Sequence, residues 1–216
     1  MNSQDFERYA KIKAMIGQIS QTWIDAFMQD IRPELLPSAC VLDYGFGDGR
    51  FYEFYLQYFE PYNIHGVEPS EIRTQKAWNR GWTHATHLPL HQPLPYSNCS
   101  FDFVNMVEVI EHIPRGEVAF YLSEIRRVLK PGGKLLLSTP NYPIKRAYDV
   151  VDALFLRQLG RLKDDPTHVS RYTTGCLRKV LGQHFSRITM KPYKFGRLYR
   201  FTRHRLVWHK ILAVCA

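Results

Sequence analysis

Cysteine is scarce in this chain of 216 residues: the four cysteines (Cys40, Cys99, Cys176 and Cys215) are scattered, without C-x-x-C spacing. This argues against a zinc site and against a disulfide framework. No N-terminal apolar stretch with a cleavage site and no bilayer-length apolar run occurs. These absences predict a cytoplasmic protein, with Cys40 and Cys215 as ordinary core residues.

Acidic residues are absent after Asp165. Residues 166–216 hold 11 Lys and Arg, whereas residues 1–165 hold 18 Lys and Arg against 20 acids, so the net charge of +9 comes from the end of the chain. Over residues 191–210 the basic residues interleave with aromatic ones. Such a segment would attract an anionic substrate, an acidic membrane surface or a nucleic-acid backbone. The alternative is a solvated hairpin whose charge only aids solubility.

Repeats and low-complexity segments are also absent, and this length suits one domain with a real core. Strand patterns near 40–44, 63–67, 83–86, 101–106 and 133–139 alternate with helical patterns near 48–59, 71–80, 116–130 and 173–183. Strand alternating with helix predicts a parallel sheet with helices on both faces. An antiparallel pair near 186–195 and 207–215 would close the chain.

The most informative segment is V-L-D-Y-G-F-G-D-G-R at residues 41–50. It reads as the end of a buried strand, an acid, three alternate glycines and the opening of a helix. Such glycines let the backbone turn sharply and let a ligand approach main-chain atoms that a Cβ would shield. The spacing differs from G-x-G-x-x-G, which suits a pyrophosphate.

A second strand ends in a carboxylate about twenty residues later, in I-H-G-V-E-P-S at residues 64–70. Glu68 ends the strand and Ser70 is the expected N-cap of the next helix. At this place in an α/β unit a carboxylate holds a ribose diol, because two acceptor oxygens match two adjacent hydroxyls. The alternative is a solvated glutamate at a strand end.

The pattern D-x-G-x-G-x-G beginning at Asp43 resembles the first motif of class I S-adenosylmethionine-dependent methyltransferases. L-P-Y-S-N-C-S-F-D-F-V at residues 94–104 and L-K-P-G-G-K-L at residues 129–135 resemble later segments of the same superfamily. The resemblance covers roughly residues 38–185 and is closest to the ubiquinone-biosynthesis-like and generic small-molecule branches. It implies a Rossmann-like, seven-stranded, mostly parallel α/β sheet with helices on both faces and a C-terminal antiparallel strand.

The resemblance also implies S-adenosylmethionine as the cofactor, with Asp43 near its cationic amino-acid end and Glu68 on its ribose. The implied cofactor-binding residues are Asp43, Gly45, Gly47, Gly49, Glu68 and Met106. One departure concerns the acid that usually precedes the L-P-[FY] stretch and meets the adenine. Its position falls near Leu90, among His84, His87 and His91, so main-chain groups or a histidine would take its place.

We expect a single methyltransferase domain over residues 1–216, in four parts. A helical cap at 1–36 carries an apolar stripe and ends at Pro33 and Pro37; a cofactor-binding core follows at 38–142. The stripe consists of Tyr9, Ile12, Ile16, Ile19, Trp23 and Phe27. Residues 143–165 form a helical insertion, and residues 166–216 form a C-terminal helix and a basic β-hairpin. The insertion follows a strand, which favours an apolar lid over the ligand crevice rather than a helix that completes the core.

Methyl transfer from a sulfonium is an in-line displacement, so the protein must align the reactants, exclude water and, for a hydroxyl, remove a proton. His112 and Glu111, just after the fourth strand, are the best-placed proton acceptors, and His168 is the next candidate. Each histidine could instead make only a structural hydrogen bond.

Glu108-x-x-Glu111-His112 with a later histidine resembles the E-x-x-E-H…H metal set of small-RNA 2′-O-methyltransferases, and a similar motif occurs in the ubiquinone O-methyltransferases. At this spacing the groups would share one helical face and suit a divalent ion that acidifies a hydroxyl. Many relatives with E-H at this place need no metal, so no metal ligand is assigned. A divalent ion on Glu108, Glu111 and His112 stays as the alternative.

The leading hypothesis is a methyltransferase that acts on an oxygen of a small-molecule or lipid-like acceptor, for which the basic tail favours an anion. The protein would be cytoplasmic, with peripheral contact to an anionic membrane or another polyanion through residues 191–210. A metal-assisted RNA 2′-O-methyltransferase is the alternative, although no nucleic-acid-binding module is recognisable. A non-catalytic, cofactor-binding partner protein would keep Gly45, Gly47 and Glu68 but lose the pocket histidines, which this chain retains.

Overall fold

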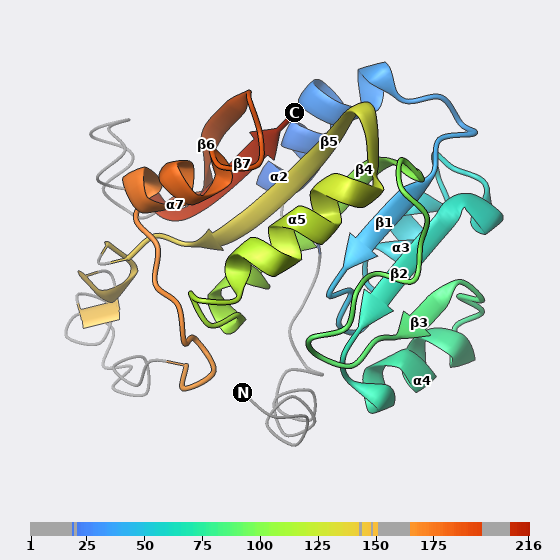
Figure 1. Cartoon of the computed structure of the whole chain (residues 1–216), viewed down its shortest axis with the longest axis horizontal. Coiled ribbons are helices and arrows are strands. Elements are labelled where there is room, and N and C mark those ends of the chain that lie inside the picture. The colour runs from blue at the N-terminus through green and yellow to red at the C-terminus, as the bar shows by residue number, and fades with distance from the viewer. Residues whose placement is uncertain (1–18, 20, 143, 148, 151–164, 196–207) are drawn as a thin grey trace.

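The computed structural model describes residues 19, 21–142, 144–147, 149–150, 165–195 and 208–216 (Figure 1). Within these ranges seven strands form one sheet in the order β3-β2-β1-β4-β5-β7-β6. The strands are β1 (Val41–Tyr44), β2 (Ile64–Glu68), β3 (Ala85–His87), β4 (Phe101–Val107), β5 (Leu129–Pro140), β6 (Ile188–Phe195) and β7 (Trp208–Cys215). Strands β1 to β5 pair in parallel, and β7 lies antiparallel between β5 and β6. The predicted Rossmann-like α/β sheet with its C-terminal antiparallel strand is confirmed.

The α-helices with defined bounds are α2 (Gln21–Ala26), α3 (Tyr52–Tyr55), α4 (Glu71–Asn79), α5 (Val118–Val128) and α7 (Thr174–Leu181). Shorter turns are η1 (Phe27–Ile31), η2 (Arg32–Glu34), η3 (Pro61–Asn63) and η4 (Ile110–His112). Ser70 caps α4, as predicted: its hydroxyl accepts from the backbone N–H of Arg73 at 3.3 Å. Thr173 caps α7 in the same way, through Cys176 N at 3.2 Å.

Side chains alternate between the two faces of the sheet, so each strand feeds two cores. Leu42 and Val104 pack on the side of α5 and α7. Val41 and Phe103 pack on the other side with α2, α3 and α4. In Figure 1, α5 crosses in front of the sheet and α2 lies behind it. The expectation of helices on both faces is therefore correct.

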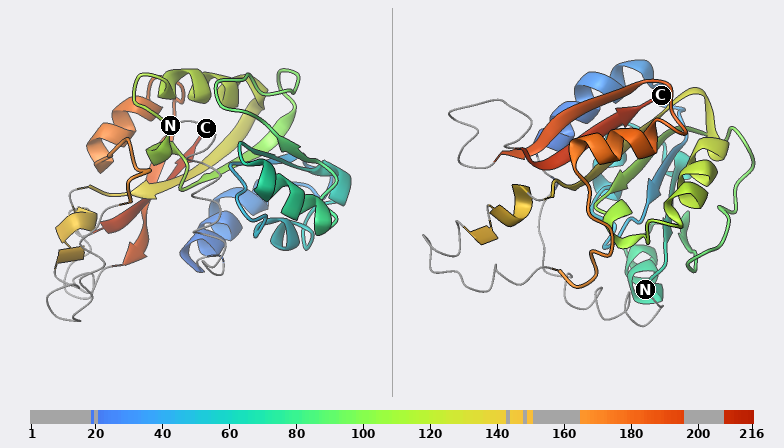
Figure 2. Two further views of the ribbon diagram at one scale, coloured as in Figure 1. Left: turned by 90° about the horizontal axis from the view of Figure 1, so that it is seen from below. Right: turned by 60° about the vertical axis from the view of Figure 1, so that its left-hand side comes forward.

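The described part of the expected N-terminal helical cap is helical, although it is not one continuous α-helix. After α2, the chain continues as the π turn η1 and the 3-10 turn η2, which contains Pro33. Figure 2 shows this segment beside the β6–β7 pair, and ion pairs fix it there: Lys191 Nζ lies 2.6 Å from Asp30 Oδ2 and Lys134 Nζ lies 2.5 Å from Glu34 Oε1. The two ion pairs thus connect the segment to β6 and β5. Tyr9, Ile12 and Ile16 of the predicted stripe lie outside the described residues.

Much of the predicted lid (143–165) also lies outside the described residues, including Val151, Leu154, Phe155, Leu156, Leu159 and Leu162. Residues 144–147 are helical, and Val150 is 40% exposed. The basic residues at 197–205 likewise fall outside the description. No helix within the described ranges has the length and apolar character needed to cross a bilayer.

Candidate active site

The carboxyl ends of β1, β2 and β4 meet the turn at residues 108–112, and two cavities open there. The Glu68 cavity is lined by Tyr44, Gly45, Val67, Glu68, Pro69, Arg73, Leu88, Pro89, Leu90, His91, Glu108, Val109, His112, Ile113, Pro114, Glu117 and Tyr121. The Lys210 cavity, of about 300 Å³, is lined by Asp43, Gly45, Phe46, Gly47, Asp48, Arg50, Phe51, Arg73, Val107, Glu108 and Lys210. Gly45, Arg73 and Glu108 belong to both, so the two cavities are adjacent.

The glycine loop forms the shared wall, and its conformation requires glycine. Gly45 has φ +73°, and a Cβ built on it would lie 2.5 Å from Cγ2 of Val109. Gly47 has φ +59°, and its Cβ would lie 3.2 Å from Nη1 of Arg73. Gly49 has φ +71° but lines neither cavity; its N–H closes a turn on Phe46 O at 3.1 Å. Gly45 and Gly47 therefore face the cavities, whereas Gly49 shapes the loop.

Glu68 is 3% exposed, which rules out the solvated strand-end alternative. Its Oε2 accepts from Gly47 N at 2.9 Å and its Oε1 from Ser70 N at 3.2 Å. Burial raises the pKa of this carboxyl, and the nearby Arg73 guanidinium opposes that shift most strongly. The carboxylate thus ties the glycine loop to the start of α4 while it lines the cavity.

Asp43 is a buried acid, and one of its two carboxylate oxygens has no hydrogen-bond partner among the described residues. Its Oδ1 accepts from Nδ2 of Asn105 at 2.9 Å, whereas Oδ2 has no hydrogen-bond partner among the described residues. Burial raises its pKa to about 7. A buried acceptor without a donor costs free energy, and a cationic ligand group in the Lys210 cavity would offset that cost.

Met106 is placed differently from its expected cofactor role. Its side chain is fully buried in the core on the α5 face and lines neither cavity. Alternation along β4 instead turns Val107 to the opposite face, where it lines the Lys210 cavity.

The lining of the Glu68 cavity includes part of the region expected to meet adenine, namely Leu90 and His91. Of the three histidines near Leu90, only His91 lines the cavity; His87 faces Pro69 O at 3.2 Å, and His84 lies against His65. A carboxylate is nevertheless present, because Glu117 lines this cavity and its Oε2 lies 3.3 Å from Nδ1 of His91. This acid comes from the residue before α5, far from the position where the sequence motif suggests it.

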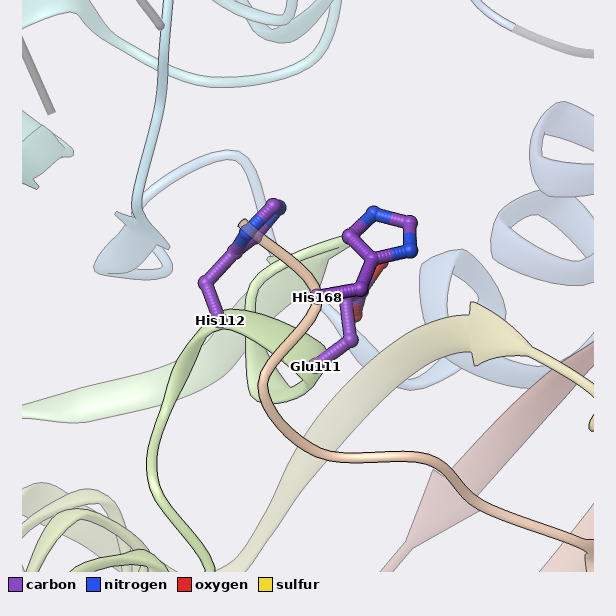
Figure 3. A group of neighbouring side chains, drawn as sticks. All are labelled: Glu111, His112 and His168. Atoms are coloured by element: carbon purple, nitrogen blue, oxygen red, sulfur yellow. The ribbon is translucent and has the colours of Figure 1, made fainter. Parts of the chain in front are cut away.

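Glu111, His112 and His168 come together in space (Figure 3), and His112 also lines the Glu68 cavity. One ligand atom from each lies within 4.8 Å of the others. Glu111 and His112 come from η4, and His168 comes from the loop before α7. Residues 56 positions apart thus share one site, as the three catalytic predictions require, although their roles stay predictions.

His112 has a defined tautomer. Its Nδ1 lies 3.0 Å from the carbonyl oxygen of Thr167, and a carbonyl can only accept, so Nδ1 carries the proton. The neutral ring therefore has its lone pair on Nε2, which is the form a base or a metal ligand needs. His168 is held by Tyr142, whose Oη lies 3.0 Å from its Nδ1.

Glu111 is fully buried, and its Oε2 accepts from the Thr139 hydroxyl at 3.0 Å. Its Oε1 has no hydrogen-bond partner in the part of the chain that the structure describes. Burial first, and then the neighbouring Glu108 carboxylate, raises the pKa of Glu111. The group is therefore poised to hold a proton or to meet a cation.

Glu108 does not belong to this cluster, in contrast to the predicted set of Glu108, Glu111 and His112. The expected common helical face does not form, because η4 begins only at Ile110 and Glu108 has φ +57°. The Glu108 carboxylate instead accepts from Ser138 Oγ at 3.0 Å and pairs with Lys210. His168 takes the third place in the cluster.

Sequence patterns missed several residues of the site. Arg73 and Glu117 are helix-associated charges that a pattern reads as solvent-exposed. Asn105 stands in an apolar strand, and a polar residue there was the one available signal. Lys210 was counted within the basic tail, but its ammonium group faces Glu108 in the cavity.

Comparisons with known proteins agree with this architecture. The family described as "Methyltransferase domain" matches residues 15–184. The ubiquinone/menaquinone biosynthesis C-methyltransferase UbiE of Psychromonas ingrahamii is 30% identical over 108 residues, which cover 48% of this chain and 42% of that protein. A tRNA (guanine-N(7)-)-methyltransferase of Deinococcus radiodurans is 36% identical over 115 residues, covering 46% and 35%. The chain thus spans less than half the length of these curated relatives.

A solved structure, the 1,6-didemethyltoxoflavin-N1-methyltransferase of Burkholderia thailandensis with bound S-adenosylhomocysteine, has a TM-score of 0.58 at 17% identity. The match covers 99% of this chain and 85% of that one, and at this identity it shows the fold alone. The domain match extends over most of the sequence, and its range includes the glycine loop. The chain belongs to the methyltransferase domain family, within the class I S-adenosylmethionine-dependent superfamily.

Proposed function

We propose that this chain transfers a methyl group from S-adenosylmethionine to an oxygen of a small-molecule or lipid-like acceptor. The observation that carries the proposal is the position of His112, which lines the same cavity as Glu68 and whose Nδ1 faces the carbonyl oxygen of Thr167 at 3.0 Å. A ribose-binding carboxylate and a proton acceptor at one cavity are what methylation of a hydroxyl needs.

The residues fit the cofactor. The orphaned Oδ2 of Asp43 suits an ammonium group, and the backbone at Gly45 and Gly47 offers space that a Cβ would fill. Glu68 would hold the ribose, and Glu117 or the backbone near His91 would meet the adenine. When bound, S-adenosylmethionine supplies an activated methyl group on a sulfonium.

The chain's own contribution is alignment and proton removal. His112 would accept the proton of the acceptor hydroxyl at Nε2, because Nδ1 is fixed as the donor to Thr167. Glu111 and His168 each have a ligand atom within 4.8 Å of one on His112, and they would orient the ring or stabilise its cationic form. Residues 143–165 are proposed to cover the acceptor as an apolar lid.

A metal-assisted version is the second candidate, favoured by the convergence of Glu111, His112 and His168. The free Oε1 of Glu111 and two imidazoles form an oxygen-and-nitrogen donor set that suits Zn²⁺, Mn²⁺ or Fe²⁺ better than Mg²⁺. These three residues would hold the ion, and a bound ion would lower the pKa of an acceptor hydroxyl.

The basic segment at 191–210 supports an anionic acceptor or peripheral contact with an anionic membrane, in a cytoplasmic protein. Two of its cations are already engaged, because Lys191 pairs with Asp30 and Lys210 with Glu108. An RNA acceptor is the alternative, to which the similarity to a tRNA methyltransferase adds weight. The similarity to a C-methyltransferase makes carbon a further acceptor atom to test.

One experiment tests this proposal at two levels. Calorimetry with S-adenosylmethionine and S-adenosylhomocysteine measures cofactor binding, for which we expect micromolar affinity, about −8 kcal/mol. Cell extract divided into RNA, lipid and small-molecule fractions is then incubated with the protein and methyl-labelled cofactor. Label in a small-molecule or lipid fraction supports the proposal if ether-cleaving reagents release it, because a carbon-bound methyl group would survive that treatment.

Label in the RNA fraction would instead favour the alternative. Cofactor binding without label in any fraction would point to a non-catalytic binding protein. Absence of cofactor binding would remove the proposal altogether.

A further inference from the structure

A buried chain of hydrogen bonds links the N-terminal segment to Asp43. The indole Nε1 of Trp23, on α2, donates to Oδ1 of Asn105 at 3.0 Å. Nδ2 of the same amide donates to Oδ1 of Asp43 at 2.9 Å. All three side chains are essentially inaccessible to solvent, with exposures of 0–1%.

The chemistry of the indole fixes the direction of this chain. An indole N–H can only donate, so the amide atom that faces it must be the oxygen. The amide nitrogen of Asn105 therefore faces Asp43, and Oδ1 of Asp43 must accept. A proton on Oδ1 would oppose the amide N–H, so the neutral form of Asp43 carries its proton on Oδ2.

We propose that Trp23 and Asn105 are positioning residues that leave only Oδ2 of Asp43 for the cationic group of a ligand in the Lys210 cavity. The inference rests on the proposed function, since that ligand is the amino-acid end of S-adenosylmethionine. A proton and the ligand's ammonium group then compete for one oxygen atom.

The indole is itself held firmly. Trp23 packs against Phe27, Phe51 and Phe54 with ring centroids 4.5–5.4 Å apart, and Phe51 also lines the Lys210 cavity. Aromatic contacts of this kind add to the burial energy of the ring. Among the described residues, the indole of Trp23 thus links α2 to Asp43 through the amide of Asn105.

Other groups also act on Asp43. The Arg50 guanidinium lowers its pKa and the Glu68 carboxylate raises it, while the buried Tyr55 stays un-ionised because burial and Asp43 raise its own pKa. Among the described residues, only the amide of Asn105 distinguishes one oxygen of Asp43 from the other by a hydrogen bond. A change at Trp23 should therefore alter the protonation of Asp43 while these groups stay in place.

The test is the pH dependence of ligand binding to the full chain between pH 5.5 and 9. In the wild type the affinity for S-adenosylhomocysteine should rise as Asp43 ionises, with a midpoint near 7. In Trp23→Phe the amide can turn over and present its oxygen to a protonated Asp43. The midpoint should move upward by about half a pH unit or more, with affinity at pH 9 within about threefold of wild type.

Calorimetry in buffers of different ionisation enthalpy gives a second readout, the number of protons released on binding. At pH 7.5 Trp23→Phe should release more protons than wild type, because more of its Asp43 is protonated before binding. Asn105→Leu, which removes the donor to Asp43, should shift the midpoint in the same direction.

Two controls distinguish an effect of the Trp23–Asn105–Asp43 hydrogen bonds from a general loss of structure. Trp82→Phe removes another buried indole donor, the one that bonds Ile64 O at 2.8 Å, and should leave the midpoint unchanged. 5′-Methylthioadenosine lacks the amino-acid end, so its affinity should not respond to Trp23→Phe.

If Trp23→Phe binds the ligand with the same pH midpoint and the same proton release as the wild type, the proposed role of Trp23 and Asn105 is wrong. The proposed function would be unaffected by that result. Failure of the wild type to bind either nucleoside would overturn the proposed function itself.

Discussion

The backbone N–H of Gly47 donates to Oε2 of Glu68 at 2.9 Å, so the glycine loop and the end of β2 are joined through one carboxylate. Glu68→Gln keeps the size of this side chain but gives it an amide nitrogen, which must face the N–H of Gly47 or of Ser70. We expect the dissociation constant for S-adenosylmethionine to rise about tenfold or more, because one hydrogen bond to the loop and one charge are lost. Glu71→Gln, an exposed acid on α4, is the charge-matched control and should bind normally.

Gly45→Ala should weaken cofactor binding more than backbone strain alone explains. Both Gly45 and Gly81 have positive φ, at +73° and +85°, but only the Cβ at Gly45 meets a neighbour, Val109, at 2.5 Å. Strain of about 1–2 kcal/mol should therefore lower the free energy of unfolding of both alanine variants. Calorimetry should show intact cofactor affinity in Gly81→Ala and at least about a tenfold loss in Gly45→Ala. Equal affinities would mean that the loop does not touch the ligand.

Asp43→Asn should stabilise the free protein at alkaline pH while abolishing tight cofactor binding. Burial raises the pKa of Asp43 from 3.8 to about 7, so the native state binds more protons than the unfolded state between these values. The wild-type stability from this group is fully present below pH 3.8 and is lost as the pH rises through about 7, by up to about 1.4 kcal/mol per pH unit. Urea unfolding at pH 5, 6.5 and 8 should show this slope in the wild type and a flatter profile in Asp43→Asn. Parallel profiles would contradict the burial of an ionisable Asp43.

His112→Ala should lower turnover by about a hundredfold, the lower range for loss of a general base, while cofactor affinity stays nearly intact. His184→Ala, a histidine beyond α7, is the matched control. A chelator separates the two mechanisms: activity that is lost and restored by Mn²⁺ or Zn²⁺ supports the metal, whereas indifference supports a direct base. If His112→Ala turns over like the wild type, neither mechanism holds.

The basic tail makes a prediction about salt. We expect replacement of Arg197, Arg200 and Arg203 by serine to raise the apparent Michaelis constant for an anionic acceptor, or to release the protein from anionic vesicles. Cofactor binding should be unchanged. Because the Debye length is about 10 Å at 0.1 M salt, the wild-type effect should fade as salt increases. The charge-matched control is a second triple variant with the same net charge, in which serine replaces three exposed cations on other parts of the fold, Arg126, Lys179 and Arg187. If the two triple variants behave identically with the acceptor, with vesicles and with RNA, the basic residues of the tail contribute only to solubility.

The sheet and the glycine loop were predictable because their signals are local. Strand and helix periods, the spacing of Gly45 and Gly47, and the acid at Glu68 all lie within short segments, and the structure places them where these patterns indicate. The pairing of Glu111 with His168 needed the resemblance to a family, since no local rule joins residues so far apart. The links from Trp23 to Asn105 and from Lys210 to Glu108 cross the fold and involve residues whose sequence context reads as core or as tail. Contacts of that kind depend on packing, which periodicity does not encode.

The position of β7 between β5 and β6 has a consequence for biosynthesis. Of the described strands it is the last to leave the ribosome, yet it occupies an interior place in the sheet. Until it is made, the outer edge of β5 remains open for pairing with other chains, a state that favours aggregation. Lys210 lies on the same strand, so the cation that pairs with Glu108 beside the two cavities is also made after the other described strands. A nascent or proteolysed chain that stops before residue 208 would thus be prone to aggregate and would lack the Lys210–Glu108 ion pair.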